Sequence, residues 1–444
     1  MIEKFNIFSN IGGTKTMKSV KVEFTEKSMT GNAGLIHFGR FMKKLGLDKI
    51  LENHLSIIRA ENAEYQASDI VQILILSVLA GAKHMCHTRL LRHDGVLRKI
   101  FGWVNFPVES TFSRIFKLFT PRHCEALSDA EDQVRRKVWG NKRFGRVTML
   151  LDSSVKGVFG SQEGAAAGYN PGKKGQKSYH PLFCFIAETC ECLHNWFRTG
   201  SEYSGNGAAE FVAECFARLP EGVWKIFVMA DSAFFCGKLM DILEGRGASY
   251  LIKVKLRNLT DMLSGQKWRK VRNQPGFEAA EFPHQCSGCR KPRRFVAIRE
   301  LTGVITKGLL FPKYEYRYFC YVTNDRLSPW KAHKKYAKRA ACENWIEWCK
   351  NQVAAGSILT DDFRENSAIF QSCVFAYNLK VWLMLLTHGH KIRLEPFTVR
   401  YWFISIPGRL LTGSRTLKLK LSENSFCMEK WKLLENAVEQ LSFA

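Results

Sequence analysis

The sequence of 444 residues is poor in negative charge, because 41 Asp and Glu stand against 66 Lys and Arg and leave a formal net charge of +25. It also has no internal repeat, no low-complexity segment and no Gly-rich phosphate-binding motif, which argues against nucleotide hydrolysis as a driving reaction. Apolar residues make up 46% of the chain, enough for a sizeable globular core. The cationic excess favours a polyanionic partner, most simply nucleic acid, over a cationic solubility surface or a membrane-surface binder.

Membrane and secretion signals are missing from the pattern as well. Residues 1–18 lack the long apolar core of a secretory signal, and the apolar run at 71–82 is interrupted by Gln72 and Ser77 and is too short to span a bilayer. The 14 cysteines are spread along the chain, which suits reduced thiols. We therefore expect a cytoplasmic protein with no membrane partner.

The first third of the chain has the apolar periodicity of helices, at 35–47, 70–82, 90–101 and 111–119, and residues 1–140 are predicted to form a mainly helical DNA-binding region. Val20, Val22 and Phe24 alternate like a short strand. Residues 108–116 indicate a helix capped by Ser110 or Thr111. This helix suits a recognition helix of a helix-turn-helix-like module as well as an ordinary helix of a small bundle.

From about residue 146 short apolar strands alternate with helices. Strands are predicted at 147–151, 181–187, 192–198, 224–230 and 250–254, with helices at 206–219 and 235–246. Three strands, a helix, a strand, a helix and a strand is the order of a ribonuclease-H-like α/β core. We place its first part at 141–255 and its second part at 325–390. A β-rich insertion at 256–324, with strands at 295–298, 304–309 and 316–322, lies between them. A helical stretch is expected at 368–386 and a basic C-terminal region at 391–444.

Three carboxylates stand at positions where an α/β sheet places its chemistry. Asp152 ends the apolar run at 147–151, and Asp231 ends the run at 226–230 in the same way. Glu343 follows on a predicted helix. Carboxylates from three separate elements are able to hold two divalent ions for an in-line phosphodiester displacement. A strand-terminal Asp is often only a loop residue or a helix cap, so the joint pattern carries the prediction.

The helix with Glu343 also carries Tyr336, Arg339 and Lys350, at offsets of 0, 3, 7 and 14 from the tyrosine. At about 100° per residue the four side chains point within roughly 60° of one another. Arg339 is suited to a bidentate phosphate contact, and Lys350 to the next phosphate. The alternative is ordinary ion pairing on a helix surface, for example between Arg339 and Glu343 at i, i+4.

The spacing Tyr336-x₂-Arg339-x₃-Glu343-x₆-Lys350 resembles the Tyr-Arg-Glu-Lys signature of DDE transposases of bacterial insertion sequences, of the insertion-sequence-four-like superfamily. Further stretches are similar to one group of them, the thirteen-eighty group: QEGAAAGYNP at 162–171, SYHP at 178–181, SGNGAAEF at 204–211, ADSAFF at 230–235 and AYNL at 376–379. The resemblance covers roughly residues 34–421. Ser153 and Ser154 follow Asp152 where the group often has Thr or Ala.

The resemblance implies that Asp152, Asp231 and Glu343 form a catalytic triad binding two Mg²⁺, with Mn²⁺ able to substitute. It implies that Tyr336, Arg339 and Lys350 act on DNA near the cleaved end. It also implies partners: double-stranded DNA, as terminal inverted repeats and target, and a second copy of the chain in a dimeric synaptic complex. In a bacterium such a protein would be associated with the nucleoid.

Other residues have weaker signals. Lys173, Lys174 and Lys177, close to Asp152 in sequence, suit phosphate contacts or merely a solvated loop, and Tyr179 suits stacking on a base. Trp330 suits base stacking, but a structural role is the more common one for tryptophan. Cys286 and Cys289 have the spacing of half a zinc site without a second matching pair.

The sequence thus predicts a DDE transposase that cleaves transposon ends and transfers strands into target DNA. Two alternatives stay open. One is a ribonuclease-H-like nuclease without strand transfer, and the other is a DNA-binding protein with an inactive core.

Overall fold

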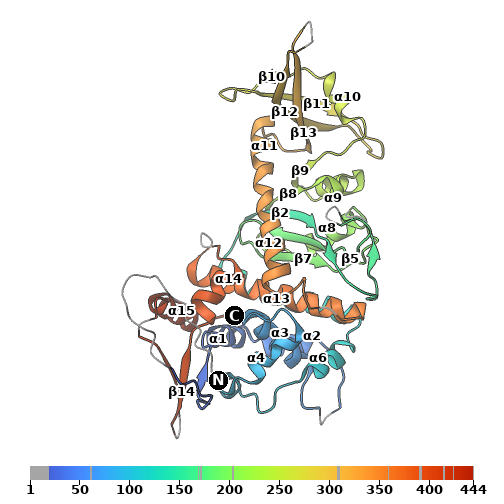
Figure 1. The fold of residues 1–444 in the computed structure, drawn as a ribbon. Coiled ribbons are helices and arrows are strands. Elements are labelled where there is room, and N and C mark those ends of the chain that lie inside the picture. The colour runs from blue at the N-terminus through green and yellow to red at the C-terminus, as the bar shows by residue number, and fades with distance from the viewer. Residues whose placement is uncertain are drawn as a thin grey trace, which may run out of the picture.

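The computed structural model describes residues 20–60, 63–168, 170, 173–202, 205–307, 311–358, 360–389, 393–413, 416–423 and 425–443 (Figure 1). Parts of three sequence patterns lie outside these residues: the segment 1–18, positions 169, 171 and 204 of the family-like stretches, and the end of the strand predicted at 304–309. The molecule is elongated, with the N-terminal helices at one end and strands β10–β13 at the other. The predicted mixed α/β fold with helices before the sheet is confirmed.

The N-terminal region is helical, as predicted. Its elements are α1 (Leu35–Leu45), α2 (Leu47–His54), α3 (Ala67–Leu79), η1 (Met85–Thr88), α4 (Arg89–Arg92), α5 (Gly95–Phe101), α6 (Glu109–Phe116) and α7 (Pro121–Asn141). Gly46, with φ of 68°, ends α1 and lets α2 begin at once. The strand predicted around Val20 and Phe24 is wrong, because these side chains are exposed and have no partner strand to pair with. The first strand is instead β1 (Met29–Thr30).

Helix α6 exists as predicted, but its cap differs. The helix begins at Glu109 with Val108 at the N-cap, and neither Ser110 nor Thr111 caps it. Glu109 places a negative side chain in the first turn of α6, where the helix dipole favours it. The same carboxylate forms ion pairs with Arg89 and Arg92.

The central strands form one mixed sheet. Strands β2 (Arg146–Ser153), β8 (Lys225–Ala230) and β9 (Ser249–Lys253) are parallel neighbours, and β6 (Leu182–Ile186) and β7 (Cys192–Trp196) follow β2 as antiparallel strands. Helix α8 (Ala208–Ala217) contacts β7, and helix α9 (Gly237–Gly245) contacts β9. The two helices also contact each other. The predicted order of strands and helices is therefore present.

The strands of the predicted insertion extend this sheet rather than forming another. They are β10 (Arg269–Lys270), β11 (Phe277–His284), β12 (Arg293–Ile305) and β13 (Lys313–Thr323), preceded by α10 (Leu259–Ser264). Because β13 pairs with β9, the nine strands run in the order β10-β11-β12-β13-β9-β8-β2-β6-β7. The two strands predicted at 295–298 and 304–309 are one strand, β12, with a register shift between Leu301 and Gly303. Strand β11 was not predicted.

Beside the sheet runs a nearly continuous rod of α11 (Pro329–Ala337), η3 (Lys338–Ala340), α12 (Ala341–Glu347) and η4 (Trp348–Gln352) (Figure 1). Helix α11 contacts β11 and β12, and α12 contacts β2. The rod is not uniform: η3 is a 3₁₀ turn and η4 a π turn. The predicted regular helix is therefore correct in position but wrong in its hydrogen-bond pattern.

Helix α13 (Phe363–His388) packs between the N-terminal helices and the sheet, in contact with α3, α7 and β7. Asp362 caps it by accepting hydrogen bonds from the amides of Arg364 and Glu365. Among the helices of the described residues it is the one that is long and apolar enough to cross a membrane, and 94% of its most apolar window is buried inside the protein. The core of a soluble protein passes the same test, so this apolarity is explained by burial.

A buried polar network joins α7, β7 and α13. Arg135 of α7 forms ion pairs with Asp132 and with Glu191, the residue before β7, and donates to the carbonyl of Cys192 at 2.9 Å. Asn378 of α13 exchanges hydrogen bonds with the backbone of Cys192 and donates to Glu131. The family-like stretch at 376–379 therefore has a structural role here.

The chain ends in a small second unit of structure: α14 (Pro396–Val399), η5 (Arg400–Ile404), β14 (Gly408–Thr412), β15 (Leu417–Leu421) and α15 (Met428–Gln440). Strand β14 pairs with β1 and β15, and α15 packs on α1.

Candidate active site

Asp152 and Asp231 lie side by side at the ends of two parallel strands. The pairing of β2 with β8 matches Leu151 with Ala230, so the two aspartates are the next positions on both strands. Neighbouring strands lie about 4.8 Å apart, and ligands of open α/β sheets bind at this carboxyl edge. Asp152 is buried and Asp231 half-buried.

Glu343 comes to the same edge on α12, which contacts β2. Its side chain is exposed and makes no hydrogen bond or ion pair to another described residue. Burial raises the pKa of Asp152 to about 6; the guanidinium of Arg339 opposes this rise, and the negative charges of Asp231 and Glu343 add to it. The three predicted carboxylates therefore share one electrostatic environment.

Each aspartate is anchored through one oxygen. Oδ1 of Asp152 accepts from Nη2 of Arg339 at 2.8 Å and from the amide of Ser153 at 2.9 Å. Oδ1 of Asp231 accepts from the amide of Ala233 at 2.9 Å, in the 3₁₀ turn η2 (Ser232–Phe234). The Oδ2 atoms of Asp152 and Asp231 accept no hydrogen bond and form no ion pair with a described residue. Hard carboxylate oxygens of this kind are the ligands that Mg²⁺ prefers.

The described residues nevertheless contain no group of three His, Cys, Asp or Glu side chains close enough to hold a metal ion as they stand. The donor chemistry fits a divalent cation, but the donors are not yet gathered. The exposed side chain of Glu343 has no partner among the described residues, so it is free to turn toward the two aspartates.

Arg339 and Tyr336 point at the protein rather than at solvent. Arg339 is 7% exposed and its charge is paired with Asp152, so the predicted alternative of an Arg339–Glu343 surface pair is wrong. The hydroxyl of Tyr336 donates to the carbonyl of Ala230, next to Asp231, at 3.3 Å, and burial raises the pKa of Tyr336 to about 12. Both side chains hold the ends of β2 and β8, and their contact with DNA stays a prediction.

Lys350 also binds backbone. Its ammonium donates to the carbonyl of Val155 at 2.7 Å, and Lys156, 3% exposed, donates to the carbonyl of Ala355 at 3.1 Å. Each lysine thus ties the segment after Asp152 to the segment after the Glu343 helix, in opposite directions. We call this pair the lysine brace. Sequence reasoning missed Lys156, because a lysine in a two-residue strand, β3, has no periodic signal.

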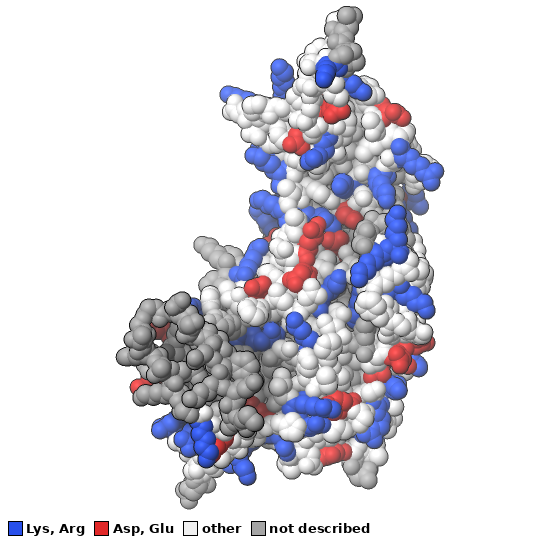
Figure 2. Space-filling model, in the orientation of Figure 1, with Lys and Arg blue, Asp and Glu red and all other residues white. Residues whose placement is uncertain are grey.

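Lys173, Lys174 and Lys177 are exposed, as a phosphate-binding surface requires. Lys177 begins β5 (Lys177–Tyr179) of a small sheet that also contains β3 (Lys156–Gly157) and β4 (Ala166–Ala167), and Lys173 and Lys174 lie in the turn before β5. Figure 2 shows acidic side chains gathered near the middle of one face, over the region of β2 and α12, with Lys and Arg on both sides.

Two aromatic candidates are not available for base stacking. Tyr179 is fully buried, packs on Phe197 and Phe363, and donates to the carbonyl of Glu163 at 2.7 Å. Trp330 packs on Phe277 and stacks on His333, which is the structural role expected as the more common one. Both rings already pack against aromatic neighbours within the protein, and these contacts take the place of stacking on a DNA base.

Cys286 and Cys289 are free thiols next to each other, and burial raises the pKa of Cys286 to about 11. No set of metal ligands forms around them in the described chain, so the zinc site finds no support.

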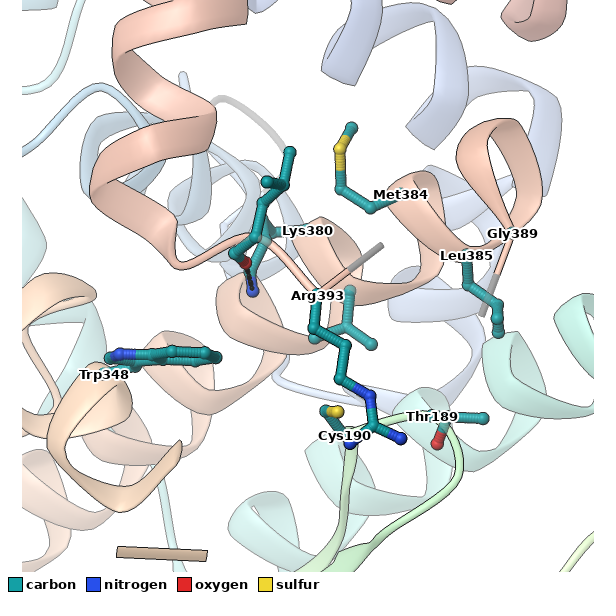
Figure 3. A pocket seen from close by; sticks show the side chains of 10 residues that line it. Thr189, Cys190, Trp348, Lys380, Met384, Leu385, Gly389 and Arg393 are labelled. Carbon is teal, nitrogen blue, oxygen red and sulfur yellow. Dashed lines mark hydrogen bonds between the residues drawn. The ribbon is translucent and has the colours of Figure 1, made fainter. Parts of the chain in front are cut away.

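A small cavity behind the rod lies apart from the carboxylates (Figure 3). It has room for about one water molecule, about 20 Å³, between Trp348, Lys380 and Arg393. Lys380 donates to the carbonyl of Leu394 at 3.0 Å and faces the ring of Tyr377, and burial lowers its pKa to about 8. The cavity is a packing defect around a buried lysine and is too small for a substrate.

Comparisons with known proteins give one match along nearly the whole chain. A protein-family model described as "Transposase DDE domain group 1" matches residues 13–442. No curated protein sequence matches the chain. Among solved structures, that of a piggyBac transposase synaptic complex with hairpin DNA is similar at a TM-score of 0.39, with 12% identity over 81% of each chain.

Proposed function

Because the chain belongs to the family of transposases with a DDE domain of group 1, we propose that it cleaves DNA at transposon ends and joins them to target DNA. The family is one of DNA transposition, and its members are generally enzymes that cleave DNA phosphodiesters. The finer assignment, to the thirteen-eighty group with a ribonuclease-H-like core, rests on the motifs and on the order of strands β7-β6-β2-β8-β9.

The observation that carries the proposal is the placement of Asp152 and Asp231 on adjacent parallel strands, with Glu343 on the helix that contacts β2. These three carboxylates would hold two Mg²⁺, or Mn²⁺, which supply an activated water or 3′-hydroxyl and a stabilised leaving oxygen. Arg339 and the Ser153 amide orient Asp152, and the Ala233 amide orients Asp231. Tyr336 fixes the strand end between them through Ala230.

The proposed function also implies binding partners and a cellular location. The exposed lysines of β5 and the turn before it would contact phosphates near the cleaved end, and the N-terminal helices would bind the terminal inverted repeats. Two copies of the chain would hold the two ends in one complex. A cytoplasmic, nucleoid-associated protein fits the net charge of +25.

The test uses a duplex ending in the inverted repeats that flank the gene, incubated with the full-length protein, a target plasmid and Mg²⁺ or Mn²⁺. We expect cleavage and joining by the native protein. Asp152→Asn, Asp231→Asn and Glu343→Gln should each lower the cleavage rate about 1,000-fold or more, because members of one catalytic unit are costly to remove. A second readout is binding of Mn²⁺ by calorimetry, which the three variants should weaken.

The matched control is Glu347→Gln, which changes an exposed carboxylate one turn further along α12 and should leave the rate unchanged. If Asp231→Asn cleaved as fast as the native chain, the assignment of the triad would be wrong. Cleavage without joining would favour the nuclease alternative. Binding without cleavage would favour an inactive core.

A further inference from the structure

One large aromatic side chain close to the candidate site remains uncovered. Phe159 is 80% exposed, whereas the neighbouring Tyr179 is fully buried. A single exposed apolar residue is common on protein surfaces and by itself means little. The backbone support and the neighbouring charges of Phe159 indicate whether this side chain binds a ligand.

The backbone under Phe159 is held in place. The amide of Val158 donates to the carbonyl of Lys177 at 3.0 Å, and Nε2 of Gln162 donates to the carbonyl of Phe159 itself at 3.0 Å. The next residue is Gly160 with φ of +112°, a conformation that favours glycine and turns the chain back. The ring is therefore presented from a fixed position at the end of the small sheet.

One cation lies beside the ring. Nζ of Lys173 is 5.7 Å from the ring centre, within cation–π range, and Lys174 in the same turn and Lys177 at the start of β5 are exposed. The nearby carboxylate of Glu163 is turned away, because it accepts from the amide of Phe363 at the start of α13 at 3.0 Å. Among the described residues none of the three lysines forms an ion pair. An exposed aromatic face beside a lysine that forms no ion pair with a described residue is complementary to a nucleotide, with its flat base and its phosphate.

Phe159 is also within reach of the reacting end. Phe159 is seven positions after Asp152 in the chain, and seven extended residues span at most about 25 Å. That distance corresponds to about seven nucleotides at 3.4 Å each. Phe159 therefore lies no farther than about seven nucleotides from a phosphate bound at Asp152.

From this geometry we infer that Phe159, with Lys173, forms a stacking site for an unpaired DNA base next to the cleaved end. The inference rests on the proposed function and adds the form of DNA that the site takes. Stacking uses the π face that every base has, so the site does not select a sequence. Phosphates on either side of the base would lie against Lys174 and Lys177.

The test compares binding of two fluorescent probes by the full-length protein: a 20-nucleotide oligo-dT strand and a blunt 20-base-pair duplex. Phe159→Ala should weaken binding of the single strand roughly 5- to 100-fold, the usual cost of losing one stacked base, and binding of the duplex less than about 2-fold. Phe159→Trp should bind the single strand at least as tightly as the native chain. Lys173→Met should weaken both probes and lower the salt dependence.

The matched control is Phe311→Ala, which removes a side chain that is 76% exposed on the connection between β12 and β13 and should change neither affinity. Equal single-strand binding by the native chain and Phe159→Ala would overturn the stacking site while leaving the proposed transposase intact. An equal loss in Phe311→Ala would reduce the effect to general surface apolarity and would also overturn it. Failure of the native chain to bind either probe would overturn the proposed function together with this inference.

Discussion

At the scale of single residues, the ion pair between Arg339 and Asp152 determines the resting state of the site. The two side chains are 9% and 12% exposed, so their charges depend on each other rather than on water. A buried charge left without its partner is strongly destabilising, whereas removal of both partners costs much less. Arg339 therefore favours the charged form of the Asp152 carboxylate on β2.

A double-mutant cycle measures this dependence. Arg339→Met should lower the free energy of unfolding by about 3 kcal/mol in the native background, and by less than about 1 kcal/mol in an Asp152→Asn background. The measurement is urea denaturation at pH 7.5. Arg317→Met is the control, because its pair with Glu300 is 66% and 33% exposed and should contribute about 1 kcal/mol or less. Additive losses for Arg339 and Asp152 would show that the pair is not coupled.

The sequence predicted that Asp152 and Asp231 lie together at one strand edge, but not which side chains contact them. Asp152 and Asp231 are predictable, because each ends an apolar run and parallel strands bring such ends to one edge. The partner of Arg339 is not, because helical spacing relates it to Glu343 whereas its contact is 187 positions away in the chain. Phe159 was missed because exposure of one aromatic residue has no periodic signal.

At the scale of elements, the rod that carries the signature residues changes its hydrogen-bond pattern twice. The 3₁₀ turn η3 contains Arg339 and the π turn η4 contains Lys350. A tighter and a wider turn rotate these side chains away from a regular helical face, toward Asp152 and Val155. Such switches follow from packing against distant segments, so local spacing does not predict them. The same reason explains β11, whose place depends on pairing with β12.

The lysine brace belongs to this scale, and it distinguishes two roles for Lys350. If Lys350 and Lys156 hold the two segments together, Lys350→Met and Lys156→Met should each lower the cleavage rate about 10- to 100-fold, since a displaced catalytic group is costly. DNA affinity should change less than about 2-fold. The slope of log affinity against log salt concentration should stay the same.

Lys174→Met is the comparison for that experiment, because an exposed lysine that contacts a phosphate should reduce the salt slope by about 0.9. A reduced slope for Lys350→Met would mean that Lys350 leaves Val155 and contacts DNA. In that case the brace would describe only the free protein.

Gly200, which lies against β5 of the small sheet, sets a second condition on the same region. A Cβ at Gly200 would lie 1.9 Å from the carbonyl oxygen of Ser178. We expect Gly200→Ala to displace β5 and weaken DNA binding with the loss of the lysine surface, while Gly245→Ala, at a position with open space, leaves binding unchanged. Affinity for the duplex probe measures both, and equal binding by Gly200→Ala would contradict the close approach.

At the scale of the whole molecule, the buried network of Arg135, Glu131 and Asn378 fastens the helical end to the sheet. Burial raises the pKa of Glu131 to about 8, from an ordinary value of 4.5, although Arg135 opposes the rise. The folded protein therefore binds more protons than the unfolded chain between these two pH values. Stability contributed by this group is present at low pH and is lost as the pH rises toward 8.

Glu131→Gln should remove this pH dependence, because the amide keeps the shape and stays neutral. Between pH 5.5 and 8.5 the native Tm should fall by roughly 2 °C or more beyond that of the variant. Glu125→Gln changes an exposed carboxyl on the same helix and should follow the native profile. Parallel profiles for the native chain and Glu131→Gln would show that Glu131 is charged in the folded protein.

The central position of α13 has a consequence for folding of the chain during its synthesis on the ribosome. Helices α3 and α7, which α13 covers, are complete once residue 141 has been made, yet α13 begins only at residue 363. At 5–20 residues per second, the roughly 220 intervening residues take about 10 to 45 s to synthesise. During that time the apolar surfaces of α3 and α7 are without their final cover. The nascent chain is therefore expected to depend on chaperones until its last fifth emerges, and a copy truncated before residue 363 should be insoluble.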